Sequence, residues 1–430
     1  MAKIRVLSAL LLSGALAVTA SGCASQSSGA SDSLTYWSMW KEGEAQQKVV
    51  AAAIADFEDE TGITVNVQWQ GRDNVKKVVP TLNTNKTPDL IDGSFAKLAP
   101  ILAETNQAAP LTKAYDAEVD GKKVSDLIPS AYLKAGELTL EGADAPWMLP
   151  YSLTSDAVWF NAAEHPELVE KAPATWDEFI DTLDELQAKG ETPIGIDGDV
   201  SGYNAYWYTT LMMRLDGPGS LKKMAADESG AAWESADALT AAKMVSQLAT
   251  GDYFIDGYNA SKWPAQQQAW ADNKAALMFN GTWIPTETGP YAADGFEYSS
   301  FPFPQVDGGP MAQRADFVGF AVPAKAHNSE NAQKLAAFFL GKTYQDDLGT
   351  EAKIIPIRQD AAVSDEMSTV KAALDNADEF YQQNDGITFP GYTEKLLWPE
   401  LDKLVLGTIT PEKFIDEMKA GQIDYWKQNS

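Results

Sequence analysis

The chain has a single cysteine, Cys23, and this residue constrains how the rest of the chain folds. One cysteine cannot close a disulfide within a chain, so the folded part must depend on an apolar core rather than on crosslinks. Hydrophobic residues make up 45% of the 430 residues, which is enough to build such a core, and the length favours two domains.

An export signal precedes Cys23. Residues 1–22 combine a basic start at Lys3 and Arg5, an apolar run over residues 6–18 and a set of small residues. The apolar run is shorter than the roughly 20 apolar residues that a transmembrane helix needs. The sequence Ala-Ser-Gly-Cys at residues 20–23 resembles a bacterial lipobox, which implies cleavage before Cys23 and a lipid on its thiol. The alternative is an ordinary secreted protein that carries this cysteine by chance.

Residues 23–33 follow as a lipidated cysteine and a flexible Ser/Gly-type tether. One short acyl chain holds a protein only marginally, so we expect a multi-chain lipid. The folded body is then predicted at the extracellular face of the cell membrane, held through the lipid anchor only.

The chain is strongly acidic. Its formal net charge is −28, and this becomes −30 when Lys3 and Arg5 leave with the signal. Such a field repels nucleic acid, phosphates and anionic headgroups, but does not oppose a neutral solute. We therefore expect no nucleic-acid partner, and because no feature of the sequence argues for an oligomer, we expect a monomer.

Strand and helix patterns alternate along the chain, which predicts an α/β fold. Predicted strands cover residues 34–39, 63–67, 87–92, 155–160, 193–196, 275–279 and 317–322. Predicted helices cover residues 44–60, 206–215, 238–250, 264–272 and 330–340, with Gly62 ending the first. Thr175 and Glu178 have capping-box spacing before a helix that runs to Lys189, and Thr410 with Pro411 opens a C-terminal helix.

Signals for catalysis are poor. The only histidines are His165 and His327, and no cysteine of the folded body accompanies them, which disfavours a zinc site or a His-dependent triad. No Gly-x-Ser-x-Gly, P-loop or dinucleotide motif occurs. We predict neither catalytic residues nor a metal or cofactor. A glycoside hydrolase stays open as an alternative, because two of the 61 acidic residues could lie about 5–9.5 Å apart in the fold.

Short motifs in a specific order resemble a known family. They are Leu34–Trp40, Phe57–Val67, Thr87–Leu90, Leu149–Tyr151, Trp159–Asn161, Pro173–Phe179, Lys274–Trp283, Phe301–Pro304, Phe317–Pro323 and Ile354–Pro356. Together they are similar to the extracellular solute-binding proteins of ABC importers, in the carbohydrate-binding group that includes maltose-binding protein. The resemblance covers nearly all of residues 34–427.

The resemblance implies a periplasmic-binding-protein-like α/β fold of two discontinuous lobes with a hinge and a ligand cleft between them. Lobe 1 is predicted over residues 34–152 and 305–352, and lobe 2 over residues 153–304 and 353–430. The chain crossings are expected near residues 151–155, 304–316 and 353–358. Binding energy that differs between open and closed forms would drive closure around the ligand.

The implied function is capture of a sugar and its delivery to the permease subunits of an ABC importer. The chain has 13 Trp residues, and pyranose rings are bound by aromatic platforms with polar side chains that exchange hydrogen bonds with hydroxyls. Several candidate platforms suggest a di- or oligosaccharide. The alternatives are a receptor of the same fold for another solute, such as a polyamine or a glycerophosphate, and a binding protein that signals to a sensor. Any single Trp is also a candidate for core packing.

In lobe 1, the resemblance and the position after predicted strands point to four ligand residues. Trp40 and Glu44 follow the first strand, where the carboxyl ends of strands line the crevice of open α/β sheets. Asp92 follows the strand at residues 87–92, and Arg72 lies in the loop at residues 70–73. A solvated surface charge is the equal alternative for Arg72.

In lobe 2, the resemblance implies ligand contacts near the start of one helix, where Asn204, Tyr206 and Trp207 lie, with Trp207 as the favoured stacking platform. Trp283, after the turn at residues 280–282, is a second predicted platform. The remaining predicted ligand residues are Trp263, Asp316, Arg358 and Tyr392. Arg358 is as well placed to brace the hinge as to donate to hydroxyls, and Trp398 is an alternative to Tyr392.

Overall fold

A computed structural model describes residues 33–135, 138–140 and 142–429 of the chain. The predicted signal, Cys23 and residues 23–32 of the tether lie outside the described residues. Within the described part, the chain builds a mixed α/β body with two main sheets. No helix in this part combines the length and the apolar character needed to span a bilayer.

The larger sheet has six strands in the order β12-β6-β11-β3-β1-β2. Their bounds are β1 Ser33–Ser38, β2 Thr64–Trp69, β3 Leu90–Ser94, β6 Met148–Thr154, β11 Asp316–Ala321 and β12 Ile355–Pro356. Strand β1, next to the edge strand β2, runs parallel to β2 and β3, whereas β11 runs antiparallel to β3 and β6. Because β1 is parallel to both neighbours, the carboxyl ends of all three strands meet at one edge of the sheet, as the sequence predicted.

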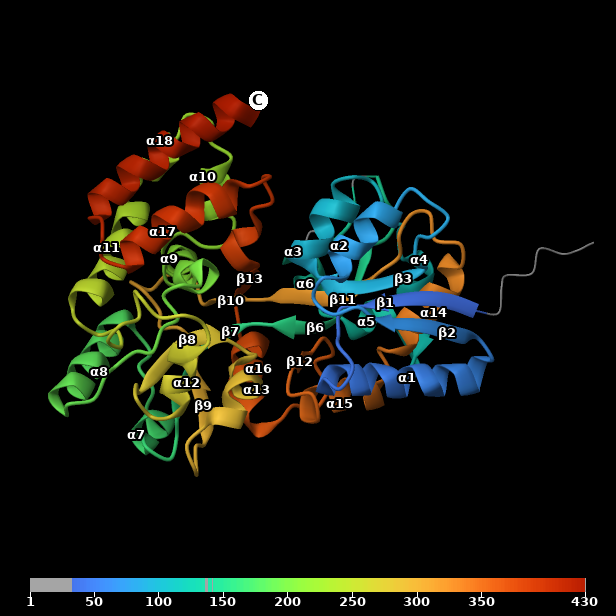
Figure 1. Cartoon of the computed structure of the whole chain (residues 1–430), viewed down its shortest axis with the longest axis horizontal. Helices are drawn as coiled ribbons and strands as arrows, with labels where there is room; N and C mark the ends of the chain where they lie inside the picture. Colours follow the sequence, from blue (N-terminus) through green and yellow to red (C-terminus); the bar gives the residue numbers. More distant parts are fainter. Residues whose placement is uncertain (1–32, 136–137, 141, 430) are drawn as a thin grey trace, which may run out of the picture. The chain divides into compact units, whose positions relative to one another are not determined.

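Helices and a short hairpin surround the larger sheet (Figure 1). The helices are α1 Ala45–Thr61, α2 Asn74–Val78, α3 Phe95–Leu98, α4 Thr112–Asp116, α5 Val124–Leu127, α6 Ser130–Ala135, α14 Ser329–Phe338 and α15 Lys342–Thr350, and the hairpin pairs β4 Glu118–Val119 with β5 Lys122–Lys123. Helix α1 buries Val50, Ile54 and Phe57, which recur at helical spacing, and ends at Gly62 with φ 69°, a conformation that favours glycine.

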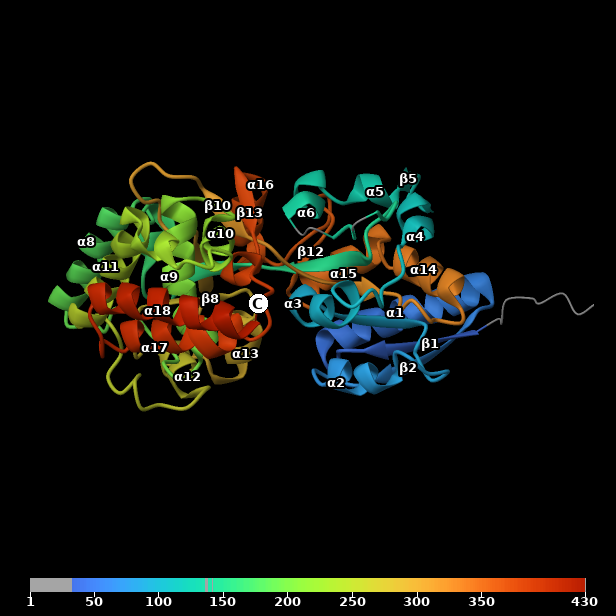
Figure 2. The same ribbon diagram turned by 90° about the horizontal axis from the view of Figure 1, so that it is seen from above.

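The second sheet is antiparallel, with the order β8-β7-β9. Its strands are β7 Asp156–Asn161, β8 Leu277–Gly281 and β9 Tyr298–Phe301, and a separate two-stranded sheet pairs β10 Ala312–Arg314 with β13 Glu379–Tyr381. The helices of this part are α7 Pro166–Glu170, α8 Trp176–Ala188, α9 Ser201–Leu215, α10 Ser220–Ala225, α11 Ala236–Thr250, α12 Ala265–Ala271, α13 Ile284–Thr288, α16 Ser368–Asp375, α17 Trp398–Val405 and α18 Pro411–Asn429. Helices α9, α11, α17 and α18 pack against one another (Figure 2).

The chain steps between the sheets at two neighbouring junctions. Strand β6 of the larger sheet leads through Ser155 into β7 of the second sheet, and β10 leads through Ala315 into β11. The Gln313 side chain ties these junctions together, because its Nε2 donates to Ser155 Oγ at 2.9 Å and to the Asp156 carbonyl at 3.1 Å. The lobe boundaries stay a prediction; β12, which those boundaries assign to lobe 2, pairs with β6 of the larger sheet.

Two strand predictions differ from the structure. Residues 193–196 form no strand, because Ile194 alone makes bridges, to Phe254 and to Leu277. The strand predicted at residues 87–92 begins later, at Leu90. Asp89 joins β1 through one backbone bond, from its N–H to the Thr35 carbonyl at 2.9 Å, and through its carboxylate, which accepts from the Thr35 N–H at 2.8 Å and from the Thr35 hydroxyl at 3.0 Å.

The predicted capping box is confirmed. The Glu178 N–H donates to Thr175 Oγ1 at 3.3 Å, and the Glu178 carboxylate accepts from the Thr175 N–H at 3.3 Å. Thr410 also caps α18, because its Oγ1 accepts from the Lys413 N–H at 3.2 Å. Both caps satisfy N–H groups that have no partner within their helices.

We expect Thr175→Ala to lower the free energy of unfolding by about 1 kcal/mol, because the first turn of α8 loses its acceptor. Urea denaturation followed by circular dichroism measures the change. Thr240→Ala is the matched control, since the Thr240 hydroxyl donates only to the Ala236 carbonyl four residues earlier in α11. Equal losses in both variants would contradict the cap.

Candidate ligand-binding site

Three aromatic side chains form a continuous face where α9 meets the end of β8. The Tyr203 and Trp283 rings stack, with centroids 5.9 Å apart and planes at 27°. The Tyr206 ring lies one helical turn beyond Tyr203, with their centroids 5.7 Å apart. Tyr203 and Trp283 are only partly buried. This group is called here the aromatic face. Its partly buried members, Tyr203 and Trp283, carry ring surfaces of the kind that stack on a sugar ring, whereas Tyr206 is 3% exposed and lies behind them.

Gly281 makes room for the aromatic face. A Cβ atom at this position would lie 2.2 Å from the Trp283 ring, which is far inside van der Waals contact. The indole therefore folds back over the end of β8, and this conformation requires glycine at position 281.

Buried polar atoms without a hydrogen-bond partner lie around the aromatic face. They are Asp197 Oδ2, Gln267 Oε1 and Trp283 Nε1. Asp197 Oδ1 accepts from the N–H groups of Gln266 and Gln267 at 3.3 and 3.4 Å, and Gln267 Nε2 donates to Glu287 Oε2 at 3.2 Å. Burial raises the pKa of Tyr203, and the charges of Glu287 and Asp197 raise it further, which places both carboxylates close to the Tyr203 ring.

Unpartnered buried polar atoms are costly, so these atoms are suited to a polar ligand. One of them is a donor, the Trp283 N–H, and two are acceptors. A group that both donates and accepts hydrogen bonds matches this mixture better than a purely anionic or cationic group does.

A buried ion cluster lies beside the aromatic face at the two chain junctions. Arg314 Nε donates to Asp316 Oδ2 at 2.6 Å, while Arg314 Nη1 lies 3.8 Å from Asp156 Oδ2. The guanidinium carbon lies 4.5 Å from the Tyr206 ring centroid and 5.9 Å from that of Trp283, within cation–π range. Burial raises the pKa of Asp156 to about 6, although the charges of Arg314 and Arg214 act in the opposite direction.

The larger sheet contributes a hydrogen-bonded chain at the carboxyl ends of β1 and β3. Trp40 Nε1 donates to the Tyr151 hydroxyl at 2.9 Å, and that hydroxyl donates to Asp92 Oδ2 at 2.9 Å. Asp92 Oδ1 accepts from the Met39 N–H at 2.6 Å. Asp92 is fully buried, and this burial raises its pKa to about 6. The structure therefore places Asp92 beneath the loop after β1 and fills both of its oxygens.

Arg72 covers the outer face of Trp40. Its guanidinium carbon lies 4.5 Å from the Trp40 ring centroid, and its Nη1 donates to Glu44 Oε2 at 2.9 Å and to the Met39 carbonyl at 2.7 Å. The Arg72 charge also lowers the pKa of Glu287, which the surrounding protein raises on balance.

Seven of the predicted ligand residues lie in two separate groups: Tyr206, Trp283 and Asp316 near the junctions, and Trp40, Glu44, Arg72 and Asp92 at the larger sheet. Asp316 is 17% exposed, and its Oδ1 accepts from the Gln383 N–H at 2.8 Å.

The favoured platform, Trp207, lies in the core with 1% of its surface exposed. Its ring contacts Phe179, Phe254, Phe279 and Phe303. This packing leaves no open ring face for stacking, so the ligand role of Trp207 stays a prediction and the site described here does not use it.

Three more predicted residues lie away from the aromatic face. Asn204 is buried and donates to the Gly198 carbonyl at 2.9 Å and to Asp402 Oδ1 at 2.8 Å. Tyr392 is fully buried, and its hydroxyl bonds to Gln422. Trp263 is 49% exposed in the loop before α12. Their ligand roles stay predictions.

Trp398, the alternative to Tyr392, lies closer to the aromatic face. Its Nε1 donates to Asn384 Oδ1 at 3.2 Å, and a Cβ atom on Gly202, next to Tyr203, would lie 3.6 Å from its ring. Trp398 is only partly buried, unlike Tyr392.

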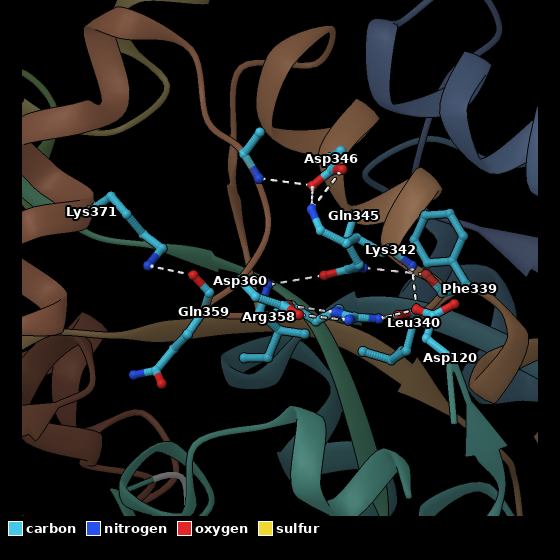
Figure 3. A network of polar contacts seen from close by, with 12 residues as sticks. Asp120, Phe339, Leu340, Lys342, Gln345, Asp346, Arg358, Gln359, Asp360 and Lys371 are labelled. Atoms are coloured by element: carbon cyan, nitrogen blue, oxygen red, sulfur yellow. Dashed lines mark hydrogen bonds and ion pairs between the residues drawn. The ribbon is translucent and has the colours of Figure 1, made fainter. Parts of the chain in front are cut away.

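Arg358 forms the centre of a polar network (Figure 3). Its Nε and Nη2 donate bidentately to Asp360 at 2.8 and 2.9 Å, and its Nη1 bonds to Asp120 and to the Leu340 carbonyl, the latter at 3.0 Å. Only 2% of the Arg358 side chain is exposed. Because these acceptors occupy all three of its nitrogens, the contacts support the bracing alternative rather than a bond to ligand.

Sequence reasoning missed Tyr203, Asp197, Gln267, Asp156 and Arg314. Tyr203 had a usable signal, since it lies three residues before Tyr206 and so on the same face of α9. Arg314 lies two residues before the predicted Asp316. Nothing in the local sequence around Asp197 or Gln267 distinguishes them from other polar residues, because their role depends on packing between segments distant in the chain.

A cavity of about 550 Å³ lies elsewhere, between α3 and α6 on one side and α10 and β13 on the other. Phe95, Ala131, Trp147, Gly219 and Phe380 are among its lining residues. None of the unpartnered buried polar atoms belongs to a residue that lines it. We therefore place the candidate site at the aromatic face rather than in this cavity.

The fold is that of the periplasmic binding proteins. The solute receptor AcbH, described as having an exclusive preference for β-D-galactopyranose, superimposes with a TM-score of 0.76 at 18% identity over 92% of this chain and 99% of that chain. A chitin oligosaccharide binding protein superimposes with a TM-score of 0.70 at 18% identity, over 91% of this chain and 98% of that chain. Similarity at this level shows the fold.

Residues 40–346 match the family model described as bacterial extracellular solute-binding protein, and the chain belongs to that family. Among its relatives is the multiple sugar-binding protein of Streptococcus mutans serotype c, 23% identical over 78% of this chain and 79% of the relative. Another is the diacetylchitobiose binding protein NgcE of Streptomyces coelicolor, 25% identical over 60% of this chain and 58% of the relative. The resemblance seen in the sequence motifs is confirmed.

Replacement of Asp197 by Asn tests the burial of its carboxylate. Burial raises the folded-state pKa of Asp197 from the ordinary value of 3.8 to about 6. The protonated side chain therefore stabilises the fold below about pH 4, and this stabilisation is lost as pH rises through 6. We expect Asp197→Asn to raise the free energy of unfolding at pH 7.5 by on the order of 1–3 kcal/mol, with the difference vanishing near pH 4. Guanidinium denaturation at both pH values measures this.

The exposed Asp181 on α8 supplies the matched control, Asp181→Asn, which should change little at either pH. A loss of stability in Asp197→Asn that is equal at both pH values would mean that the lost hydrogen bonds outweigh the relief of the buried charge.

Proposed function

We propose that this protein captures a neutral sugar, a di- or oligosaccharide, and delivers it to the permease of an ABC importer. The observation that carries the proposal is the aromatic face, where stacked Tyr203 and Trp283 rings adjoin unpartnered buried donors and acceptors. Flat ring faces fit the C–H surface of a pyranose, and mixed donors and acceptors fit its hydroxyls. The sugar-binding names of the relatives agree with this chemistry.

Capture proceeds by closure of two lobes about the chain junctions. Trp40, Glu44 and Arg72 on the larger sheet then supply the second side of the site, opposite the aromatic face. Trp40 and Glu44 support this arrangement, because both follow the carboxyl end of β1, and Arg72 contacts both of them. A ligand that contacts both sides stabilises the closed form by the difference in its affinity for the two forms.

A cationic solute is the second candidate, favoured by the carboxylates of Asp156, Asp197 and Asp316 around the aromatic face. The guanidinium of Arg314 among these carboxylates opposes it, because a ligand cation would meet a buried positive charge. A glycoside hydrolase is the third, and it differs from both in releasing new reducing ends. We propose a binding protein without enzymatic activity.

Isothermal titration against maltose, cellobiose, xylobiose, raffinose, diacetylchitobiose, galactose and spermidine separates these candidates. We expect at least one neutral sugar to bind with a sub-millimolar Kd, and a reducing-end assay to show no turnover. Binding of spermidine alone would favour the cationic solute.

With the sugar that binds, we expect Tyr203→Ala and Trp283→Ala each to weaken binding by about two- to twelvefold, because each removes a stacking surface worth about 0.5–1.5 kcal/mol. Trp426→Ala on α18 is the control, since the Trp426 ring contacts Phe389 and Tyr425 instead. Unchanged affinity in both site variants would place the ligand elsewhere.

We further propose that Cys23 carries the lipid that holds the protein at the extracellular face of the membrane. Fractionation of cells that express the full chain should find the wild type with the membranes and Cys23→Ala in the soluble or secreted fraction, because the variant lacks the acylated thiol. Ser25→Ala in the tether is the control. Membrane retention of Cys23→Ala would contradict the anchor.

A further inference from the structure

Arg314 presents a buried donor and Asp156 a buried acceptor, and the two form an ion pair without a hydrogen bond between them. The Arg314 and Asp156 side chains are 4% and 2% exposed, and their nearest atoms, Nη1 and Oδ2, lie 3.8 Å apart. This distance exceeds that of a hydrogen bond, and neither atom has another partner in the structure. The pair is therefore polar, buried and without a full set of hydrogen bonds.

The backbone holds the pair in position from both sides. Asp156 is the first residue of β7 and Arg314 the last residue of β10, so each lies next to a chain junction. Gln313 Nε2 bonds to Ser155 Oγ and to the Asp156 carbonyl, which fixes the two segments relative to each other. Asp316 occupies Arg314 Nε at 2.6 Å, which restrains the guanidinium further. The separation of Nη1 and Oδ2 is thus set by the surrounding structure.

The pair adjoins the aromatic face. The guanidinium carbon of Arg314 lies 4.5 Å from the Tyr206 ring centroid and 5.9 Å from that of Trp283. Because Tyr206 is 3% exposed, a sugar ring would approach the pair over the partly buried Trp283 ring.

The chemistry of the two atoms limits which ligand group satisfies both. Arg314 Nη1 only donates hydrogen bonds, and an ionised Asp156 only accepts them. A hydroxyl accepts from Nη1 and donates to Oδ2 at the same time. A ligand carboxylate has no proton for Oδ2 and is repelled by Asp156 and Asp316, and an ammonium has no acceptor for Nη1 and is repelled by Arg314.

We propose that Asp156 and Arg314 form a hydroxyl-selecting subsite, in which one neutral hydroxyl of the bound sugar bridges the two side chains and carboxylate or amine replacements at that position are rejected. This inference rests on the proposed sugar-binding function and assigns to these two residues a part of its specificity. Rejection arises because the wrong group leaves a buried charge unpaired.

The subsite is tested by a thermodynamic cycle that combines removal of one ligand hydroxyl with substitution of one side chain. The probes are the tightest-binding neutral sugar from the panel above and its deoxy derivatives, each lacking one hydroxyl. For wild type we expect one deoxy derivative to bind at least about tenfold more weakly through loss of the bridge. In Asp156→Asn and Arg314→Gln the parent sugar should bind at least about tenfold more weakly, and that same derivative should show little further loss. Titration calorimetry gives each Kd.

Selectivity supplies a second readout. For the position found in the cycle, we expect Asp156→Asn to narrow the preference for hydroxyl over carboxylate, and Arg314→Gln to narrow the preference for hydroxyl over amine. Arg214→Lys is the control, because the Arg214 nitrogens donate to the carbonyls of Phe303, Pro304 and Ala312 rather than facing an open acceptor. Its preferences should equal those of wild type.

The outcomes are distinct. If sugars bind but every deoxy derivative loses the same factor in wild type and in both variants, the subsite is wrong while the proposed function stands. If no neutral sugar binds, the proposed function fails and the subsite with it. Should circular dichroism show that Arg314→Gln does not fold, the isosteric Asp156→Asn and the charge-conserving Arg314→Lys replace it in the cycle. If the deoxy derivative loses the same factor of affinity in both of these variants as in wild type, the subsite is wrong.

Discussion

The guanidinium of Arg314 is the interaction on which the arrangement of the site depends. It joins three kinds of contact at one point: an ion pair with Asp316, an electrostatic attraction to Asp156 and a cation–π contact with Tyr206. Asp156 belongs to the second sheet and Asp316 to the larger sheet. Tyr206 belongs to α9, which packs on the second sheet through Phe279. A single planar cation thus brings the chain junctions and the aromatic face together, which a lysine, with its point charge and flexible stem, would do less well.

Burial has opposite consequences in the two polar groups of the site. At the larger sheet, Trp40, Tyr151 and Asp92 form a completed chain of hydrogen bonds, which keeps the loop after β1 in one conformation. Around the aromatic face, Asp197, Gln267 and Trp283 each leave an atom unpartnered. The first group supports the structure and the second is suited to bind, and this division explains why acidic residues of similar burial have different roles.

The sequence predicted the fold well because the fold is encoded in short periodic segments. Strand β1, helix α1 with its glycine stop and the capping box of α8 all lie close to their predicted positions. The site was predicted less well. On α9, Trp207 is 1% exposed and Tyr206 is 3% exposed, so both lie in the core, whereas Tyr203 is only partly buried. Motif similarity pointed to α9, but only packing decides which of its aromatic residues faces outward.

The same limit applies to polar residues. Asp92 was expected in contact with ligand, yet it is fully buried, with its oxygens occupied by Met39, Ser38 and Tyr151. Asp197 and Gln267 are brought together by a turn of α12 that meets a loop nearly 70 residues earlier in the chain. Contacts over such distances in sequence leave no local pattern.

Asp316 links the chain junction to the segment that follows β13. One of its oxygens holds Arg314 at a junction, and the other accepts from the backbone of Gln383, next to the residue that bonds to the Trp398 indole. A shift of the turn at residues 383–386 therefore cannot occur without loosening a contact at the junction. Movements of the C-terminal helices and of the strands that link the two sheets are therefore coupled through the Asp316 carboxylate.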